Sequence, residues 1–244
     1  MMRRLGTWMM WSLLCTACAT VGEPQPRIEN EGQKIMIAPS FNRQVLEKGG
    51  VAILPVTSET APEGIRKNAA YELHQALKNS FPDMPLLSDS KTLEILKQSG
   101  LDKAFLTWLK AYRSGGRVDP VLLRQIGLIT ERRYLLLARV DQYEKESKAV
   151  AVNKPSMPLT GPMISPSLSR PVSYDVFKDI RLTGLLWDSE CRSVAWEGRG
   201  GAHVTDVSPN ERVRMEDLFV IAVQNFVFAL YGSAGTASGT VQGC

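Results

Sequence analysis

The sequence predicts a mixed α/β domain of three-layer-like build, in which a mixed central sheet carries a C-terminal antiparallel hairpin and is flanked by helices. Two short apolar runs without alternation, at 51–56 and 134–140, predict strands that are covered on both faces. Apolar residues at helical spacing between these runs predict the flanking helices. A strand–turn–strand pattern over 172–204, followed by an apolar helix, predicts the hairpin and the last helical layer.

The core of the domain is expected to begin with the strand at 51–56, which lies between a glycine pair and a polar turn. Start signals for a helix follow at once. Thr60 suits the N-cap, Pro62 suits the first turn, and Glu63 stands three residues after the cap. Apolar residues over 65–81 recur on one helical stripe, so this helix is expected to lie on the sheet.

Three shorter helices are expected at 89–99, at 102–113 and from Asp119 onward, where a proline follows the capping aspartate. Trp108 and Tyr112 share a face of the second helix with other apolar residues. This spacing is typical of core packing, and an aromatic cofactor site built from the two side chains is the less favoured interpretation. We therefore assign no cofactor to the chain.

A long loop and a hairpin are expected after the strand at 134–140. Residues 145–171 contain prolines at 155, 158, 162, 166 and 171, which excludes an inner strand or a helix, so the segment is either a functional loop or a disordered one. Residues 172–188 and 191–204 alternate loosely and are joined by a polar link, which predicts an antiparallel hairpin. Glycines over 198–201 predict a bulge or a close approach of another backbone.

The last helix has a full capping box, with Ser208 at the N-cap, a proline next to it and a glutamate three residues after the cap. Its apolar stripe over 215–230 predicts a well-buried helix that ends at Gly232. Residues 233–244 are then expected to form a flexible tail, which leaves 33–232 as a single α/β domain.

The first residues have the pattern of an export signal. Two arginines precede an apolar run that is too short to span a hydrocarbon core of ~30 Å, and small residues lead into Cys18. The segment resembles a bacterial lipoprotein signal, which implies removal of residues 1–17 and lipidation of Cys18, although Cys15 stands where that signal usually has an aliphatic residue. The alternatives are a secreted protein cut near Ala19 and, less favoured because the pair lies inside the apolar run, a redox Cys-x-x-Cys.

Residues 18–32 are polar, contain proline and glycine and show no period, so they are expected to form a flexible tether. A short first strand is expected at 34–38. No later stretch reaches the ~18 consecutive apolar residues of a spanning helix, so we expect the rest of the chain to lie outside the membrane.

Charge and cysteine content narrow the possible partners and cross-links. The chain has 29 basic and 25 acidic side chains, and loss of the two signal arginines leaves 27 against 25, or +2. No Lys/Arg cluster with interleaved aromatics occurs, so nucleic acid is not an expected partner. Cys191 and Cys244 form a possible disulfide, which would fix the C-terminus to the domain. The alternative is one half-buried thiol and one terminal thiol.

The sequence offers little for catalysis. Its two histidines are His74 and His203, and it has no His-x-x-x-His, Gly-x-Ser-x-Gly, Walker-type loop or zinc-spaced cysteine cluster, so we assign no catalytic residue and no metal site. The spacing of Cys191 and His203 across one hairpin is accidental more often than catalytic. Carboxylate pairs such as Asp175 with Asp179 are better explained by solvated strand ends. We expect that the protein is not an enzyme.

Three stretches carry a resemblance to a known group: VAILPV at 51–56, the helix-to-strand passage at 119–140, and LTGLLWDSECRSVAWEG at 182–198. Together with the order of elements, they resemble the periplasmic α/β domain of the curli-secretion lipoprotein CsgG, the penicillin-binding-protein activator LpoB and the N-terminal domain of TolB. Two departures are the polar TSET turn after Val56 and the proline-rich insertion at 145–171. The insertion speaks against a CsgG-like pore, because spanning strands need ~9–11 alternating residues without repeated prolines.

The resemblance implies an outer-membrane lipoprotein that faces the periplasm and acts as a non-catalytic interaction or assembly module of the cell envelope. Ala19, rather than aspartate, after the lipidated and palmitate-bearing Cys18 favours the outer membrane by analogy with enterobacterial sorting. The expected partners are the membrane, through the lipid anchor, and an envelope protein, and a homo-oligomer is left open. One alternative is a subunit of an oligomeric secretion assembly. Another is a small-molecule-binding or hydrolytic domain with a pocket near 198–201.

Overall fold

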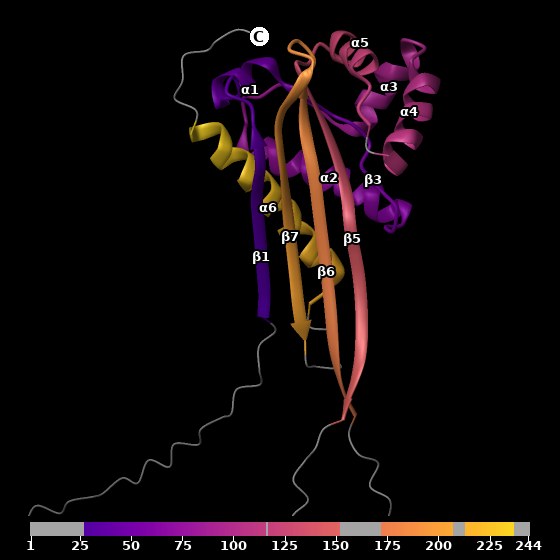
Figure 1. Ribbon diagram of the computed structural model, residues 1–244, viewed down its shortest axis with the longest axis vertical. Helices are drawn as coiled ribbons and strands as arrows, with labels where there is room; N and C mark the ends of the chain where they lie inside the picture. The colour runs from indigo at the N-terminus through magenta and orange to yellow at the C-terminus, as the bar shows by residue number, and fades with distance from the viewer. Residues whose placement is uncertain (1–26, 116, 152–171, 207–212, 237–244) are drawn as a thin grey trace, which may run out of the picture.

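A seven-stranded mixed sheet forms the centre of the molecule, in the order β1-β7-β6-β5-β2-β4, with β3 paired to β5 beside this path (Figure 1). The structure is a computed structural model, and it describes residues 27–115, 117–151, 172–206 and 213–236. Strands β1, β7, β6 and β5 pair antiparallel, whereas β2 runs parallel to both β5 and β4. The strands are β1 (Arg27–Ile37), β2 (Val51–Ile53), β3 (Thr57–Ser58), β4 (Leu86–Leu87), β5 (Tyr134–Ala151), β6 (Val172–Asp188) and β7 (Ser193–Asp206).

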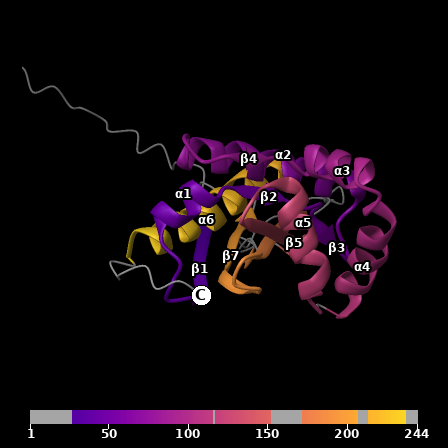
Figure 2. The same ribbon diagram turned by 90° about the horizontal axis from the view of Figure 1, so that it is seen from above.

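Helices form a layer on each face of this sheet (Figure 2). On one face α1, α2 and α6 bury the side chains of Leu136, Ile180, Leu182 and Trp196, and on the other α3, α4 and α5 bury Leu135, Leu137 and Trp187. This arrangement confirms the predicted mixed α/β fold with its flanking helices. The helices are α1 (Arg43–Gly49), α2 (Glu63–Ser80), α3 (Asp89–Gln98), α4 (Asp102–Gly115), α5 (Pro120–Thr130) and α6 (Met215–Thr236).

The predicted hairpin is present as β6 and β7, which pair from Asp188↔Ser193 down to Val176↔Asp206. The β6–β7 register shifts between Leu186 and Trp187, near the turn, and the β1–β7 register shifts between Lys34 and Met36, opposite Gly198 and Glu197. Gly200 instead allows a close backbone approach, because a Cβ there would lie 2.3 Å from the carbonyl oxygen of Ala222 in α6. The close approach predicted for these glycines is confirmed at Gly200, and an irregularity lies beside Gly198, where the extra residue belongs to β1 and not to β7.

Helix α6 is the core helix of its layer. Phe226 is fully buried and meets Trp196 of β7 edge-on, with ring centroids 5.3 Å apart and an angle of 82° between the planes. The span Met215–Ala234 is long and apolar enough to cross a membrane by length and composition, but 50% of the most apolar window is buried inside the domain. Burial of this extent is typical of a core helix.

The sequence signals for helix starts agree with the structure at α5 and disagree with it at α2. Asp119 caps α5 as expected, because its Oδ1 accepts the backbone N–H groups of Val121 and Leu122 at 3.0 Å each. The N-cap assigned to Thr60 is wrong: α2 begins at Glu63 with Pro62 at the cap and no side-chain hydrogen bond there. The capping box at Ser208 lies outside the described residues.

The predicted tether is too long at its C-terminal end. Strand β1 begins at Arg27, inside the segment 18–32, and pairs with β7 up to Ile37↔Trp196. An edge strand of this kind is held by backbone hydrogen bonds to one neighbour, so its polar side chains do not prevent pairing. The short strand expected at 34–38 is the second half of this longer strand.

Two further boundaries also differ from the prediction. Strand β5 continues to Ala151 and pairs with β6 down to Val172, so the first seven residues of the expected loop 145–171 are strand. Helix α6 runs past Gly232 to Thr236, into the expected tail 233–244. A glycine inside a helix costs only about 1 kcal/mol relative to alanine, which does not stop a helix that is packed on a core.

Candidate functional site

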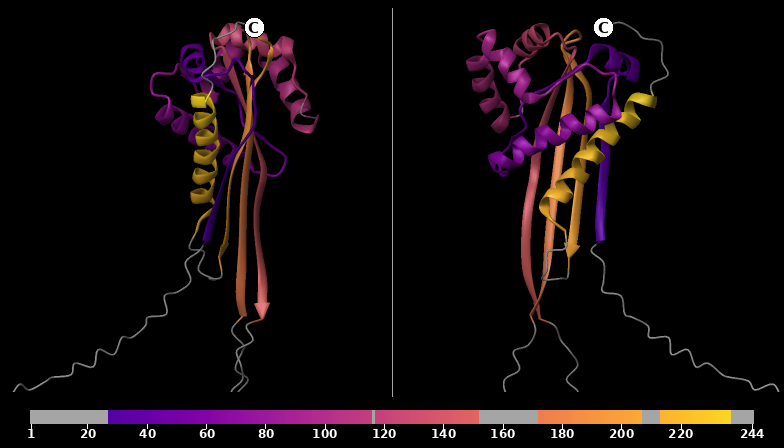
Figure 3. Two further views of the ribbon diagram at one scale, coloured as in Figure 1. Left: turned by 60° about the vertical axis from the view of Figure 1, so that its left-hand side comes forward. Right: turned by 180° about the vertical axis from the view of Figure 1, so that it is seen from behind.

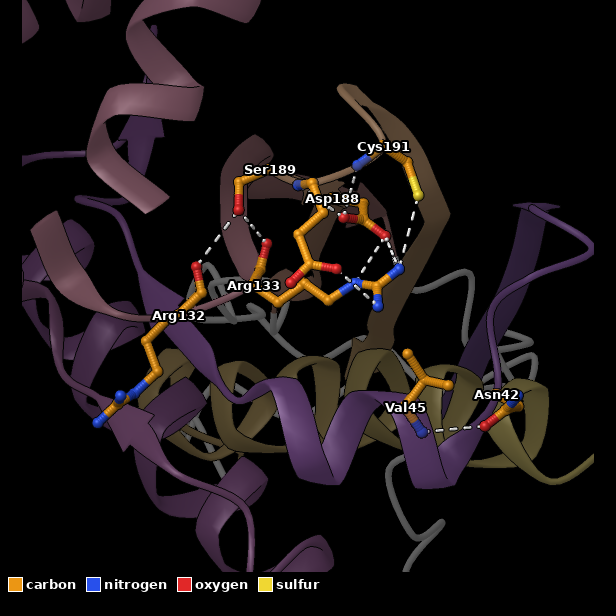
Figure 4. Close-up of polar contacts among 8 residues, drawn as sticks. Asn42, Val45, Arg132, Arg133, Asp188, Ser189 and Cys191 are labelled. Carbon is orange, nitrogen blue, oxygen red and sulfur yellow. Dashed lines mark hydrogen bonds and ion pairs between the residues drawn. The ribbon is translucent and has the colours of Figure 1, made fainter. Parts of the chain in front are cut away.

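A network of polar side chains closes the corner where β5 begins and β6 ends (Figure 4). Arg133 donates from Nε and Nη2 to Oδ2 of Asp188, at 3.0 and 2.7 Å. Its Nη1 lies 2.9 Å from Oε2 of Glu190. The other carboxylate oxygen of Asp188 accepts the backbone N–H groups of Glu190 and Cys191, at 3.0 and 3.1 Å. The Asp188 side chain is only 3% exposed.

The electrostatics of this corner favour a fixed ion pair over acid–base chemistry. Burial alone would lower the pKa of Arg133, but the hydrogen bond to Asp188 and the nearby charges raise it. The guanidinium also lies over the ring of Tyr134, with 5.4 Å between its carbon and the ring centroid, and burial raises the pKa of that phenol. Arginine is permanently charged and Asp188 is saturated with donors, so the corner acts as a clamp between strands.

Cys191 sits at the rim of the same corner. Its Sγ lies 3.5 Å from Nη2 of Arg133, and the residue is held in a disulfide. The other three cysteines, Cys244 and Cys18 among them, lie outside the described residues. The pairing of Cys191 with Cys244 and the lipidation of Cys18 therefore stay predictions.

The two histidines lie on different elements, His203 on β7 and His74 on α2. His203 pairs with Asp179 in the β6–β7 register, nine pairs of that ladder away from the Asp188↔Ser193 end, so Cys191 and His203 do not form a pair. Its Nε2 lies 3.0 Å from Oε2 of Glu29 on β1. His74 is on α2, where burial lowers its pKa. Within the described residues no group of three or more His, Cys, Asp or Glu side chains could hold a metal ion.

The aromatic pair on α4 belongs to the core, as predicted. Trp108 packs between Phe105 and Tyr112, with ring centroids 5.8 and 5.2 Å away, and its Nε1 donates to the carbonyl of Arg117 at 3.2 Å. The hydrogen bond and the buried neighbours identify Trp108 as a core residue, and Tyr112 is partly buried against the same cluster.

An apolar groove lies between α2 and α6, and we call it the α2–α6 groove. It has a volume of about 660 Å³. Phe228 stands on its wall with 74% of the residue exposed, and Tyr231 is 39% exposed. The remaining lining residues are apolar side chains, amides, one hydroxyl and one carboxylate: Ala76, Val220, Val223, Val227, Gln75, Asn79, Gln224, Asn225, Ser80 and Glu72.

The sequence shows that α6 is apolar, but its periodicity does not distinguish the side of the helix that packs on the sheet from the side that lines the groove. Residues 218–231 are apolar nearly all round, polar only at Gln224 and Asn225, and this pattern predicts a helix buried on every side. One side of α6 packs on the sheet, and Phe228 on the other side has no cover within the described residues.

The pocket expected near the glycines at 198–201 is only partly present. On the α6 side the space is filled, since a Cβ at Gly198 would lie 2.4 Å from the Trp196 ring. On the opposite face lies a polar hollow of about 550 Å³, lined by Arg181, Arg199 and Glu31 together with Asn30, Gly32 and Gln33. It holds two guanidinium groups and one carboxylate among the described residues.

No protein-family model matches the sequence, and no curated protein matches it. Among solved structures the chain is similar to the PelC dodecamer from Paraburkholderia phytofirmans, with 11% identity, a TM-score of 0.41, and coverage of 85% of this chain and 98% of that one. It is also similar to lipoprotein GNA1162 from Neisseria meningitidis, with 13% identity, a TM-score of 0.42, and coverage of 66% and 87%. The LpoB C-terminal domain from Salmonella enterica, one of the group that the sequence resembles, has 13% identity, a TM-score of 0.33, and coverage of 63% and 82%.

Proposed function

We propose that this protein is a lipid-anchored module of the bacterial cell envelope that binds another envelope protein and catalyses no reaction. The observation that supports the proposal is the α2–α6 groove, where an aromatic side chain 74% exposed stands among valines and amides. Exposed aromatic residues beside an apolar hollow are typical of protein-binding surfaces, because a partner removes their area from water and the amides orient it.

The anchor is proposed from the sequence and from where the domain begins. Cys18 follows the export signal, and β1 starts at Arg27, so only eight residues separate the lipidated position from the folded part. This short connection would hold the domain close to the periplasmic side of the outer membrane. A single acyl chain binds only marginally, so stable anchoring requires that Cys18 carries more than one.

Replacement of Cys18 with alanine is expected to abolish lipidation and membrane retention. Mass spectrometry of the purified protein should show acyl chains on the parent and none on Cys18→Ala, and the variant should leave the membrane fraction. A Cys15→Ala variant is the matched control. Residue 15 lies within the signal, so it is expected to be absent from the mature form of the parent and from the mature form of this control. A Cys18→Ala protein that is still acylated would contradict the anchor.

A photo-crosslinking residue at Phe228 is expected to capture an envelope protein in living cells. The same residue placed at Leu128 of α5, which is 67% exposed on the other side of the sheet, serves as the control. Because Phe228 is mostly exposed, its replacement should change the free energy of unfolding by less than about 0.5 kcal/mol. An adduct at 228 and not at 128 supports the proposal, and equal capture at both positions, or capture at neither, contradicts it.

A second candidate function is a subunit that assembles with copies of itself. The observation that favours it is the outer edge of β1, which pairs with no strand among the described residues and exposes Ile28, Ile35 and Met36. Edge strands of this length are templates for pairing with another chain. In that case a crosslinker at Ile35 would give a ladder of adducts between copies of this chain. A crosslinker at Phe228 would then give no adduct with another envelope protein.

A further inference from the structure

The antiparallel strands do not end at one level. Arg27, the first described residue of β1, pairs with Thr205, which pairs with Phe177, which pairs with Glu146. Beyond this level β5 and β6 continue for five pairs, from Ser147↔Val176 to Ala151↔Val172, and the last four have no third strand because β7 ends at the pair Val176↔Asp206. At about 3.3 Å per residue, β5 and β6 project roughly 17 Å past the point where the described chain begins, and we call this projecting part the ribbon.

The ribbon and the start of the described chain lie at the same end of the molecule. Figure 3 shows β1 beginning at the lower end in both views, with β5 and β6 extending further in the same direction, whereas α1, α5 and the β6–β7 turn lie at the opposite end. A membrane anchor that precedes β1 would therefore place the ribbon toward the lipid surface and the Arg133–Asp188 corner away from it.

The length of chain before β1 limits how far the domain can stand from that surface. Nine residue steps separate Cys18 from Arg27, which reach at most about 30 Å when fully extended. With the long axis of the domain upright, the ribbon covers roughly 17 Å of this distance. Eight residues with random-coil statistics would span about 16 Å, and at that span the end of the ribbon would reach the surface.

The end of the ribbon also differs in charge from the rest of it. Its last three pairs, Ala149↔Tyr174, Val150↔Ser173 and Ala151↔Val172, contain no charged residue, whereas the next pair inward is Lys148↔Asp175. No Asp or Glu occurs anywhere between positions 149 and 174 of the sequence, and Lys154 and Arg170 are the only charged residues there. An absence of carboxylates suits contact with anionic lipid headgroups.

We propose that the last three pairs of the β5–β6 ribbon rest in the headgroup region of the membrane that holds the anchor. This inference rests on the lipid anchor of the proposed function and adds a second, protein-borne contact to it. The three pairs span about 10 Å, which corresponds to an interfacial contact and is too short for the ~30 Å hydrocarbon core. A two-stranded ribbon alone is marginally stable in water, and the lipid surface supplies the missing cover.

The test uses the lipidated full-length mature protein in vesicles of phosphatidylethanolamine and phosphatidylglycerol. An environment-sensitive fluorescent amino acid replaces Val150 in one sample and Leu128, at the opposite end, in the control. Lipids brominated on the upper acyl chain are expected to quench the probe at 150 by roughly half, since interfacial groups lie about 5–10 Å into the headgroup–acyl boundary, and to leave the probe at 128 unchanged.

The outcomes separate this inference from the anchor on which it rests. Protein that floats with the vesicles but shows no quenching at 150 overturns the ribbon contact and leaves the anchor intact. Equal quenching at 150 and 128 also overturns it, because the domain would then lie flat or in random orientation. Parent protein that carries no lipid contradicts the anchor itself, whereas quenching at 150 when such protein is mixed with the vesicles would still support the ribbon contact and its absence would overturn it.

Discussion

Replacement of Gly200 with alanine is expected to lower the free energy of unfolding by about 3 kcal/mol, since overpacking a core typically costs about 1–3 kcal/mol and here the clash is with backbone. A Cβ at this position would lie 2.3 Å from the carbonyl oxygen of Ala222, 2.3 Å from the backbone nitrogen of Phe226 and 2.7 Å from its Cα. These atoms belong to α6 and cannot rotate away, so the helix itself must shift off the sheet. Urea unfolding followed by tryptophan fluorescence measures the loss.

The neighbouring glycine provides the matched control. A Cβ at Gly201 points to the other face of β7, and its nearest atoms, the Cβ of Glu31 and the carbonyl oxygen of Ile180, are 3.5 Å away, which is ordinary contact. Gly201→Ala is therefore expected to change stability by less than about 1 kcal/mol, as most substitutions without a clash do. If the two variants unfold at the same urea concentration, α6 does not lie against β7 as described.

The strands that are buried on both faces were predictable because burial leaves a direct mark on the sequence. In β5, Leu136 faces the layer of α6 while Leu135 and Leu137 face the layer of α3 to α5, so every position requires an apolar residue. The hairpin was predictable for a different reason: the polar link at 188–190 separates two apolar strands at the distance of a tight turn.

Strand β1 and the two proposed contact surfaces could not be predicted in the same way. The residues of β1 from Ile28 to Met36 are exposed, so backbone pairing to β7 and not burial decides its conformation, and its composition resembles that of a tether. The α2–α6 groove depends on which side of an apolar helix is left uncovered, and that is a property of the packed structure. The length of the β5–β6 ribbon depends on register, which no composition of a single strand reveals.

Replacement of Asp188 with alanine is expected to lower the free energy of unfolding by about 3 kcal/mol, because removal of one partner of a buried ion pair leaves the other charge uncompensated. Arg133 would lose both hydrogen bonds of its fork, and the N–H groups of Glu190 and Cys191 would lose their acceptor. The guanidinium is 21% exposed and regains some hydration, which keeps the loss at the lower end of the range for such pairs, about 3–5 kcal/mol. Urea unfolding again measures it.

The second ion pair of Arg133 provides the control. Its partner is Glu190, whose side chain is 64% exposed. An exposed ion pair is worth about 0–1 kcal/mol, so Glu190→Ala should be nearly neutral although the two carboxylates contact one arginine. Asp188→Asn should fall between the two, because the amide oxygen still accepts the backbone N–H groups of the turn while the charge is lost. An Asp188→Ala protein as stable as Glu190→Ala would mean that the corner is hydrated, and the clamp would then contribute nothing to holding β5 against the β6–β7 turn.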